Sequence, residues 1–205
     1  MPGHAFYKLV DGTIEIDGVR MHQTLNKTPL QAAHEMVGAL CLRKGEKVLD
    51  VCTGLGYTSI DEARARAKVV TVEVDEKVVE LCKQNRDSAK LFDNPLIRRF
   101  LGDAYEYVKT LEAESFDAIL HDPPRFSFAS ELYSLVFYQQ LYRVLRNGGR
   151  LFHYTGKPGE KSGKNYRKGF KNRLEMAGFQ SITWLEGPQG FLCSKASSTR
   201  PPSFD

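Results

Sequence analysis

The chain has 205 residues, of which 41% are hydrophobic and 26% charged, and its formal net charge at pH 7 is +4. This length suits one domain with a sizeable core, and the lack of a run of about 18 apolar residues excludes a membrane span. The four cysteines are scattered without a C-x-x-C pair, and the first seven residues do not resemble a signal peptide. We therefore expect a cytoplasmic protein with no metal site and no disulfide framework.

Apolar runs alternate with segments of helical periodicity along most of the chain. Short apolar runs predict buried strands at 47–52, 69–74, 96–101, 116–121 and 150–154. Apolar residues spaced near 3.6 predict helices at 57–67, 76–91, 132–145 and 165–177. Strands that alternate with helices need crossover connections, so we expect a mainly parallel sheet.

Glycine-containing turns mark the remaining boundaries. Asn147-Gly148-Gly149 is expected to end the helix at 132–145, and Gly178 is placed as a C-terminal cap of the last helix. Two further runs, at 179–185 and 190–193, predict a closing hairpin around Gly187-Pro188.

The two ends of the chain lie outside this alternation. Residues 10–20 predict a short hairpin around Asp17-Gly18, whose role stays open. We expect three parts in the chain. These are an N-terminal extension with a leading helix at 1–44, a main domain at 45–196 and a flexible tail at 197–205.

A glycine-containing turn joins the first predicted strand to its helix. Gly54 and Gly56 carry no Cβ, so the backbone can turn tightly there and approach a ligand, although an ordinary strand-to-helix turn also uses such residues. Glu73 ends the second strand nineteen residues after Gly54, near the spacing at which a carboxylate meets ribose hydroxyls. A second acid, Asp103, follows the third strand. Together these features indicate a nucleoside-binding site.

At these positions the chain resembles class I S-adenosyl-L-methionine (SAM)-dependent methyltransferases. VLDVCTGLGYTS, VTVEVD, LGDA and HDPPRF are similar to the four motifs of that family, in its order and spacing. The resemblance implies an α/β, Rossmann-like fold: a seven-stranded, mostly parallel sheet with helices on both faces and a C-terminal antiparallel hairpin. It also implies SAM as the cofactor, with the glycine loop around its methionine part, Glu73 on the ribose and Asp103 facing the adenine. The implied cofactor residues are Asp50, Thr53, Gly54, Gly56, Tyr57, Thr58, Glu73, Asp103 and Ala104.

The fourth predicted strand ends in His121-Asp122-Pro123-Pro124-Arg125-Phe126. Ligands of open α/β sheets bind beyond the carboxyl ends of the strands, so this segment is expected to face the transferred group. The Asp122 carboxylate and the Pro123 carbonyl are placed to accept hydrogens from an attacking amino group and to aim it. His121 is a candidate base or a structural histidine, and Arg125 is a candidate for gripping an anion or for pairing with an acid.

Asp122-Pro123-Pro124 also resembles the [DNS]-P-P-[YFW] motif of amino-group methyltransferases. Arg125 stands where those enzymes have an aromatic residue, and Phe126 comes next as the candidate for stacking on the substrate. DPPRF is also similar to a segment of ribosomal-RNA cytosine-C5 methyltransferases. Those enzymes need a cysteine after the fifth strand, and residues 151–156 contain none, so covalent C5 chemistry is rejected.

Taken whole, the chain most resembles a group of predicted archaeal methyltransferases. The shared patterns are Arg20-Met21-His22, C-T-G-L-G-Y-T at 52–58, H-D-P-P-R-F-S at 121–127 and L-F-H-Y at 151–154. This resemblance implies methyl transfer without naming a substrate.

A basic segment follows the fifth predicted strand. Aromatic residues alternate there with cations, which suits an RNA backbone and its bases, whereas a solvated surface is the simpler interpretation. The candidate RNA-binding residues are Lys164, Arg167, Lys168 and Lys171. The leading hypothesis is therefore SAM-dependent methylation of an RNA base nitrogen.

Other functions remain open at this point. Leu132-Tyr133-Ser134, Phe137-Tyr138 and Gly148-Gly149 resemble a stretch of spermidine synthases, which are aminopropyl transferases that use decarboxylated SAM. Because those enzymes bind polycations, the basic segment argues against that activity. Methylation of a small molecule or a protein, and RNA binding without catalysis, are the remaining alternatives. The oligomeric state stays open.

Overall fold

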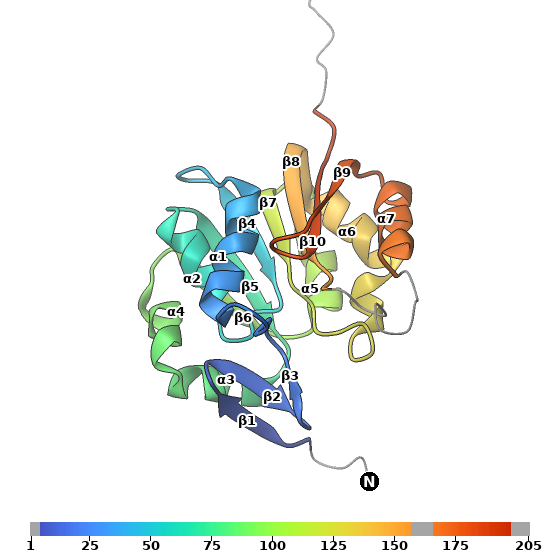
Figure 1. The fold of residues 1–205 in the computed structure, drawn as a ribbon. Coiled ribbons are helices and arrows are strands. Elements are labelled where there is room, and N and C mark those ends of the chain that lie inside the picture. The colour runs from blue at the N-terminus through green and yellow to red at the C-terminus, as the bar shows by residue number, and fades with distance from the viewer. Residues whose placement is uncertain (1–4, 157–165, 198–205) are drawn as a thin grey trace, which may run out of the picture.

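A computed structural model describes residues 5–156 and 166–197, and a seven-stranded sheet forms its centre (Figure 1). The strand order is β6-β5-β4-β7-β8-β10-β9, and β10 runs antiparallel to both of its neighbours while the other pairs are parallel. This arrangement confirms the predicted fold class. The strands are β4 (Lys47–Val51), β5 (Lys68–Glu73), β6 (Ile97–Leu101), β7 (Phe116–His121), β8 (Leu145–Tyr154), β9 (Gln180–Leu185) and β10 (Gly190–Ser194).

The order of the strands reverses at β4. The chain moves outward from β4 through β5 to β6, and then returns to place β7 on the other side of β4. In open α/β sheets the loops after the strands diverge at such a point and leave a crevice for a ligand. The carboxyl ends of β4, β5 and β7 meet there.

Helices cover both faces of the sheet. Successive side chains of β7 point to opposite faces of the sheet and meet these helices. Ile119 packs with α5, α6 and α7, while Leu120 packs with α1. Both residues are fully buried. The helices are α1 (Pro29–Leu40), α2 (Tyr57–Arg64), α3 (Glu76–Gln84), α4 (Ala89–Asp93), α5 (Ala104–Thr110), α6 (Leu135–Val144) and α7 (Tyr166–Met176).

A separate three-stranded antiparallel sheet precedes α1 and lies below the large sheet in Figure 1. It consists of β1 (Tyr7–Val10), β2 (Thr13–Ile16) and β3 (Val19–Arg20). The hairpin expected at 10–20 is only the second half of this sheet. The first turn, at Asp11-Gly12, carries the same Asp-Gly signal as Asp17-Gly18, and the sequence analysis left it unused.

Two hydrogen bonds fasten this small sheet to the main domain. The Tyr57 hydroxyl of α2 donates to the carbonyl of Gly12 at 2.9 Å. The Tyr7 hydroxyl of β1 donates to the Asp75 carboxylate, which also caps the first turn of α3. The N-terminal sheet therefore lies at the carboxyl ends of the large sheet, next to the crevice.

Two predicted helices are interrupted. The helix expected at 76–91 ends at Asn85, whose side-chain amide donates to the hydroxyls of Tyr57 at 2.8 Å and Ser88 at 2.7 Å. The chain continues there as a 3₁₀ turn, Arg86–Ser88, and then as α4. The helix expected at 132–145 begins as a separate 3₁₀ turn, Ser130–Tyr133, because the Ser134 hydroxyl caps α6.

The boundary expected at Asn147-Gly148-Gly149 also lies elsewhere. α6 ends at Val144, and β8 already begins at Leu145 and runs through both glycines. Gly148 has a φ of +74° and donates to the carbonyl of Lys195 at 3.1 Å. The glycines therefore belong to an irregular strand end that pairs with the chain after β10, and the register of β7 against β8 shifts at the same level.

The remaining sequence expectations concern the membrane and the tail. Among the helices of residues 5–156 and 166–197, none has the length and the apolar character that a membrane span needs. Most of the predicted tail at 197–205 lies outside the described residues.

Glu62 of α2 is a buried carboxyl group with an unusual environment. It is fully buried, and neither carboxyl oxygen has a hydrogen-bond partner among the described residues. Burial raises its pKa well above the ordinary value, and the charges of Asp50 and Asp61 raise it further. A raised pKa in the folded state means that Glu62 favours folding least when the pH is high.

Replacement of Glu62 by methionine should therefore stabilise the protein at alkaline pH. The contribution of Glu62 is most favourable below its ordinary pKa of about 4.3 and is lost as the pH rises toward the raised value. We expect Glu62→Met to increase the free energy of unfolding by about 1–3 kcal/mol at pH 8 and by less at pH 5, since an unsatisfied buried polar group costs about that much. Urea denaturation at both pH values measures this. The exposed Glu80→Met serves as the control, and a Glu62→Met effect that does not depend on pH would contradict the account.

Candidate functional site

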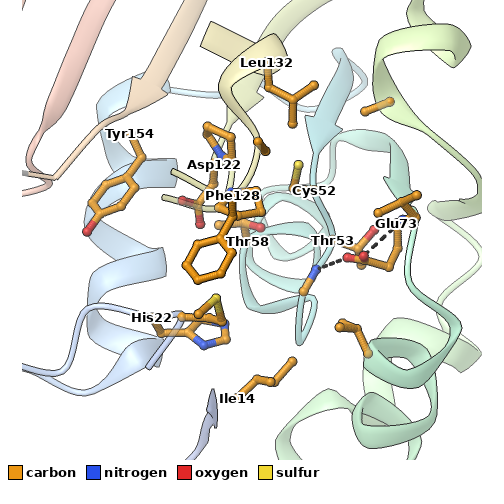
Figure 2. Close-up of a pocket in the computed structure, with 18 of the residues that line it drawn as sticks. Ile14, His22, Cys52, Thr53, Thr58, Glu73, Asp122, Phe128, Leu132 and Tyr154 are labelled. Atoms are coloured by element: carbon orange, nitrogen blue, oxygen red, sulfur yellow. Dashed lines mark hydrogen bonds between the residues drawn. The ribbon is translucent and has the colours of Figure 1, made fainter. Parts of the chain in front are cut away.

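A cavity of about 290 Å³ occupies the crevice at the carboxyl ends of β4, β5 and β7 (Figure 2). Its volume is close to the lower end of the range for small-molecule sites. Residues that follow the strands form one side: Cys52, Thr53, Gly54, Glu73, Val74, Asp103, Ala104, Asp122 and Pro123. The N-terminal sheet, the segment after it and α1 form the other: Ile14, Ile16, Met21, His22, Gln23, Pro29, Ala32, Ala33 and Met36.

Glu73 ends β5 and binds three backbone N–H groups. Its Oε2 accepts from Gly54 at 2.9 Å, and its Oε1 accepts from Val74 at 3.0 Å and from Asp75 at 3.1 Å. Burial raises the pKa of Glu73, and these three donors oppose that shift. The carboxylate thereby holds the glycine loop after β4 against the end of β5, and it lines the cavity as the sequence predicts.

The structure places Asp50 beneath this loop, outside the lining of the cavity. Its fully buried carboxylate accepts hydrogen bonds from Ser59, from Thr58 at 3.2 Å and from Thr71 at 3.2 Å. Burial raises the pKa of Asp50 to about 6, and these hydroxyl donors oppose the rise. Asp50 therefore fixes the first turn of α2 to β4 and β5, and it supports the loop after β4 from below.

The two glycines of the loop have different roles. Gly54 lines the cavity, and a Cβ placed on it would point toward Nε2 of His22 at 3.7 Å. Gly56 does not line it. It precedes α2 with a φ of +73°, and a Cβ there would lie 2.6 Å from the Leu91 side chain. Gly56 is thus needed for packing against α4, whereas Gly54 is the glycine that leaves room beside the cavity.

Tyr57 and Thr58, the first residues of α2, both line the cavity. The Tyr57 hydroxyl also binds Gly12, so one side chain joins the cavity to the N-terminal sheet. Asp103 and Ala104 line the cavity as well, and Asp103 caps α5 by accepting from the backbone of Tyr105 at 2.8 Å.

Cys52 is a lining residue that the sequence analysis did not assign to the site. It follows β4 with a φ of +73°, a conformation that favours glycine and costs an L-residue about 1–2 kcal/mol. Burial raises the pKa of its thiol well above the usual value, so the thiol is neutral at pH 7 and is not a nucleophile. The positive φ angles of the loop therefore begin at Cys52, directly after β4, and recur at Gly54 and Gly56.

Asp122 and Pro123 also lie where the sequence places them. Asp122 follows β7, and its backbone N–H donates to Val51 of the neighbouring strand at 3.2 Å. Its carboxyl group lines the cavity near Tyr154 and Phe128 (Figure 2). Burial raises the pKa of Asp122 to about 7, with a further contribution from the charge of Asp50. The group therefore exchanges a proton near neutral pH.

His121 does not reach the cavity. Its side chain points to the opposite face of the sheet, where it is fully buried and stacks on His153 with ring centroids 4.3 Å apart. Neither ring nitrogen has a hydrogen-bond partner among the described residues. Burial lowers the pKa of His121 well below its usual value. The structural interpretation of His121 is therefore the one that fits, because alternation along β7 directs it to the face opposite to Leu120, which packs with α1.

Phe126 and Arg125 lie outside the cavity too. Phe126 packs on Tyr133 and Phe170, with ring centroids 5.4 Å and 5.9 Å away. Phe128, two residues later, is the aromatic residue that lines the cavity, and 54% of its surface is exposed. Arg125 lines a neighbouring groove. The chain turns after the prolines, where the Phe128 N–H donates to the carbonyl of Arg125 at 2.7 Å, so counting along the motif does not identify the side chain that faces the cavity.

The candidate RNA-binding residues of α7 do not line the cavity. The Arg167 guanidinium lies over the ring of Trp184, 4.9 Å from its centroid, and 4.0 Å from the Glu186 carboxylate. Lys171 pairs with Glu175 at 3.7 Å. Lys168 does not line the cavity, and Lys164 lies outside the described residues.

The N-terminal side of the cavity was not foreseen in detail. Nδ1 of His22 lies 2.8 Å from the Thr13 hydroxyl, and burial lowers the pKa of this imidazole to about 4. Gln23 has a buried side-chain oxygen that faces no donor among the described residues. The Arg20-Met21-His22 pattern was the available signal, since Met21 and His22 both line the cavity. Among the described residues, no group of three or more histidine, cysteine, aspartate or glutamate side chains is arranged to hold a metal ion.

Comparison with known proteins identifies similar chains. Residues 31–168 match the model of the spermine/spermidine synthase domain. The uncharacterised protein MJ1233 of Methanocaldococcus jannaschii is 46% identical over 196 residues, which is 94% of this chain and 68% of that protein. Polyamine aminopropyltransferase 1 of Pseudomonas aeruginosa is 29% identical over 149 residues, 71% of this chain and 49% of that protein.

Solved structures show the same fold. A spermidine synthase in complex with the transition-state analogue AdoDATO superposes with a TM-score of 0.72 over 90% of this chain and 66% of that one, at 20% identity. A proposed SAM-dependent methyltransferase of Methanococcus maripaludis superposes with a TM-score of 0.60 over 82% of this chain and 86% of that one, also at 20% identity. The chain thus spans between about half and two thirds of the matched relatives in the synthase group.

Gly56 offers a test of the packing beneath the loop. We expect Gly56→Ala to lower the free energy of unfolding by about 1–3 kcal/mol, because the added Cβ meets Leu91 and the positive φ is strained. Leu91→Ala removes the clashing atoms, so the double variant should lose less stability than the sum of the two single variants. Denaturation of all three variants measures this coupling. Strictly additive losses would show that Gly56 and Leu91 do not press on each other.

Proposed function

The chain belongs to the spermine/spermidine synthase domain family, and from this premise we propose that it transfers an alkyl group from an S-adenosyl sulfonium compound to a nitrogen nucleophile. The observation that carries the proposal is the cluster of acids around the end of β4. Glu73, Asp103 and Asp122 line the cavity, and the buried Asp50 carboxylate lies beneath the loop. Their charges add to the larger effect of burial in raising the pKa of the Cys52 thiol. Such a site favours a ligand with a positive sulfonium.

The residues of the cavity fit an S-adenosyl ligand. Gly54 leaves open space beside the loop, with His22 as the nearest side chain. Oε1 of Glu73 already accepts two backbone N–H groups, but Oε2 accepts only one and keeps a lone pair, so a ribose hydroxyl has an acceptor there. Apolar Val74, Ala104 and Leu132 line the cavity together with Asp103 and suit an adenine. When SAM is bound, it supplies a methyl group on a positively charged sulfur.

Asp122 is the group that would prepare the acceptor. An amine attacks a carbon only with a free lone pair, and it must lose a proton. With a pKa of about 7, the Asp122 carboxyl group can orient the amine by accepting its hydrogen and can take up the proton near neutral pH. The Pro123 backbone, which follows Asp122 in the cavity wall, is rigid and fixes the direction of approach.

Methyl transfer from SAM is our first choice of reaction. The Asp122-Pro123-Pro124 pattern of amino-group methyltransferases supports it, as does the structural likeness to the M. maripaludis protein. We keep a base nitrogen of RNA as the proposed acceptor, because a planar exocyclic amine suits that pattern. The surface pairs of Arg167 and Lys171 give no support to an RNA path along α7.

Aminopropyl transfer from decarboxylated SAM is the second candidate. The family, the Pseudomonas relative and the likeness to spermidine synthase favour it. The cavity also holds Glu131 in addition to Asp122, and acids of this kind attract a polyamine. The two reactions differ in the donor, since only SAM carries a carboxylate on the methionine part.

Calorimetric titration separates the two donors. We expect the protein to bind SAM more tightly than decarboxylated SAM, and Glu73→Ala to weaken SAM binding by about 1–3 kcal/mol, which is about 5- to 150-fold. The exposed Glu76→Ala, three residues along the chain, is the matched control and should bind SAM like the parent. Preference for decarboxylated SAM would select aminopropyl transfer. Failure to bind either donor would refute the proposed function.

Asp122→Asn tests the reacting end of the site. The variant should keep SAM affinity close to the parental value and transfer methyl groups at least about a hundredfold more slowly, because it cannot take up a proton. In the parent the single-turnover rate should rise between about pH 6 and pH 8 and then level, as the carboxyl group loses its proton around its pKa of about 7. Labelled SAM with cell RNA and extract first identifies an acceptor fraction. Near-parental rates in Asp122→Asn would exclude a catalytic role.

A further inference from the structure

A second, more open hollow of about 530 Å³ adjoins the cavity. It lies between β3 with the segment after it and the turn before β10, and we call it the arginine groove. Three side chains line both hollows: His22, Gln23 and Tyr154. The arginine groove therefore begins where the cavity ends, and a ligand whose reacting atom lies near Asp122 can extend into it.

The charge of the arginine groove is opposite to that of the cavity. Arg20 and Arg125 both line it, and the described lining residues include no aspartate or glutamate. Arg125 is exposed and forms no ion pair with a described residue. Arg20 pairs with Asp11 at 3.1 Å, but 42% of the Arg20 side chain and 73% of the Asp11 side chain are exposed, so the pair is weak and leaves most guanidinium donors available.

Tyr154 connects the two regions. Its phenol feels the charge of Asp122, which raises its pKa, and that of Arg125, which lowers it, in addition to the larger effect of burial. Figure 2 shows Tyr154 beside Asp122 at the edge of the cavity. Asp122 and Arg125 thus act on the same side chain with opposite charge. The Gln23 side-chain oxygen, buried and without a partner among the described residues, lies on the same boundary.

We propose that the acceptor carries an anionic group, a phosphate or a carboxylate, which Arg125 and Arg20 bind in the arginine groove while its nucleophile faces Asp122. This inference rests on the proposed alkyl transfer. Guanidinium groups bind both anions through paired, charge-assisted hydrogen bonds. The Gln23 oxygen would accept a hydrogen from the acceptor between its two ends. A polyamine bears positive charge at both ends, so the two arginines would repel the end distant from Asp122.

Nuclear magnetic resonance of the arginine side chains tests this directly in the intact protein. The Nε–Hε signals are followed while inorganic phosphate, acetate or putrescine is added, and Arg125→Gln and Arg20→Gln assign the signals. Arg64, an exposed arginine of α2 that pairs with Asp61 at 3.4 Å, is the matched control. We expect phosphate or acetate to shift the Arg125 and Arg20 signals to saturation while the Arg64 signal barely moves. The anion that saturates at lower concentration identifies the group.

Loss of either arginine should weaken the binding of that anion by about tenfold or more. This factor corresponds to the loss of one charge-assisted hydrogen bond. Arg64→Gln should leave the affinity unchanged. The inference is overturned if the Arg125 and Arg20 signals respond no more than that of Arg64, or if putrescine binds the groove more tightly than both anions. SAM titrated into the same sample keeps the two claims apart. SAM binding without an anion response contradicts only this inference, and an anion response without SAM binding contradicts the proposed alkyl transfer.

Discussion

The three backbone hydrogen bonds to the Glu73 carboxylate are the interaction on which the rest of the site depends. Gly54 belongs to the loop after β4, whereas Val74 and Asp75 follow β5, so one side chain joins the ends of two neighbouring strands. The Asp75 carboxylate accepts a hydrogen bond from the Tyr7 hydroxyl. The same residue thereby fixes the first strand of the N-terminal sheet. The Glu73 carboxylate thus connects the side of the cavity formed by the strand ends to the side formed by the N-terminal sheet.

Negative charge accumulates around these bonds, and the protein tolerates it in different ways. Asp50 is surrounded by hydroxyl donors and Glu73 by backbone donors, so each carboxylate is solvated by the protein. Asp122 has less of such support, and its pKa rises to about 7. The group with the weakest solvation is therefore the one suited to exchange a proton, and it lies where the acceptor would enter. The arginine groove reverses the charge immediately beyond it.

The sequence predicted the features that depend on neighbouring residues in the chain. The strand ends at His121 and Glu73, the closing hairpin and the acids after the strands follow from local patterns and motif spacing. The direction of a side chain after a turn does not follow from such patterns. Phe128 lines the cavity instead of Phe126, because the chain turns at residues 126–128, where the Phe128 N–H donates to the carbonyl of Arg125. Gly56 packs on Leu91, a contact between segments that no spacing rule reveals. The N-terminal side of the cavity depends on contacts such as the hydrogen bond of Tyr57 with Gly12, which joins residues 45 positions apart.

A crystal structure with bound SAM tests the central claim most directly, because the account assigns each end of the ligand to a named carboxyl group. We expect ribose hydroxyls within hydrogen-bond distance of Glu73, the adenine beside Asp103, and the sulfonium methyl directed at the space between Asp122 and Tyr154. A ligand bound outside the cavity, or bound with its methyl group directed away from Asp122, would contradict the account.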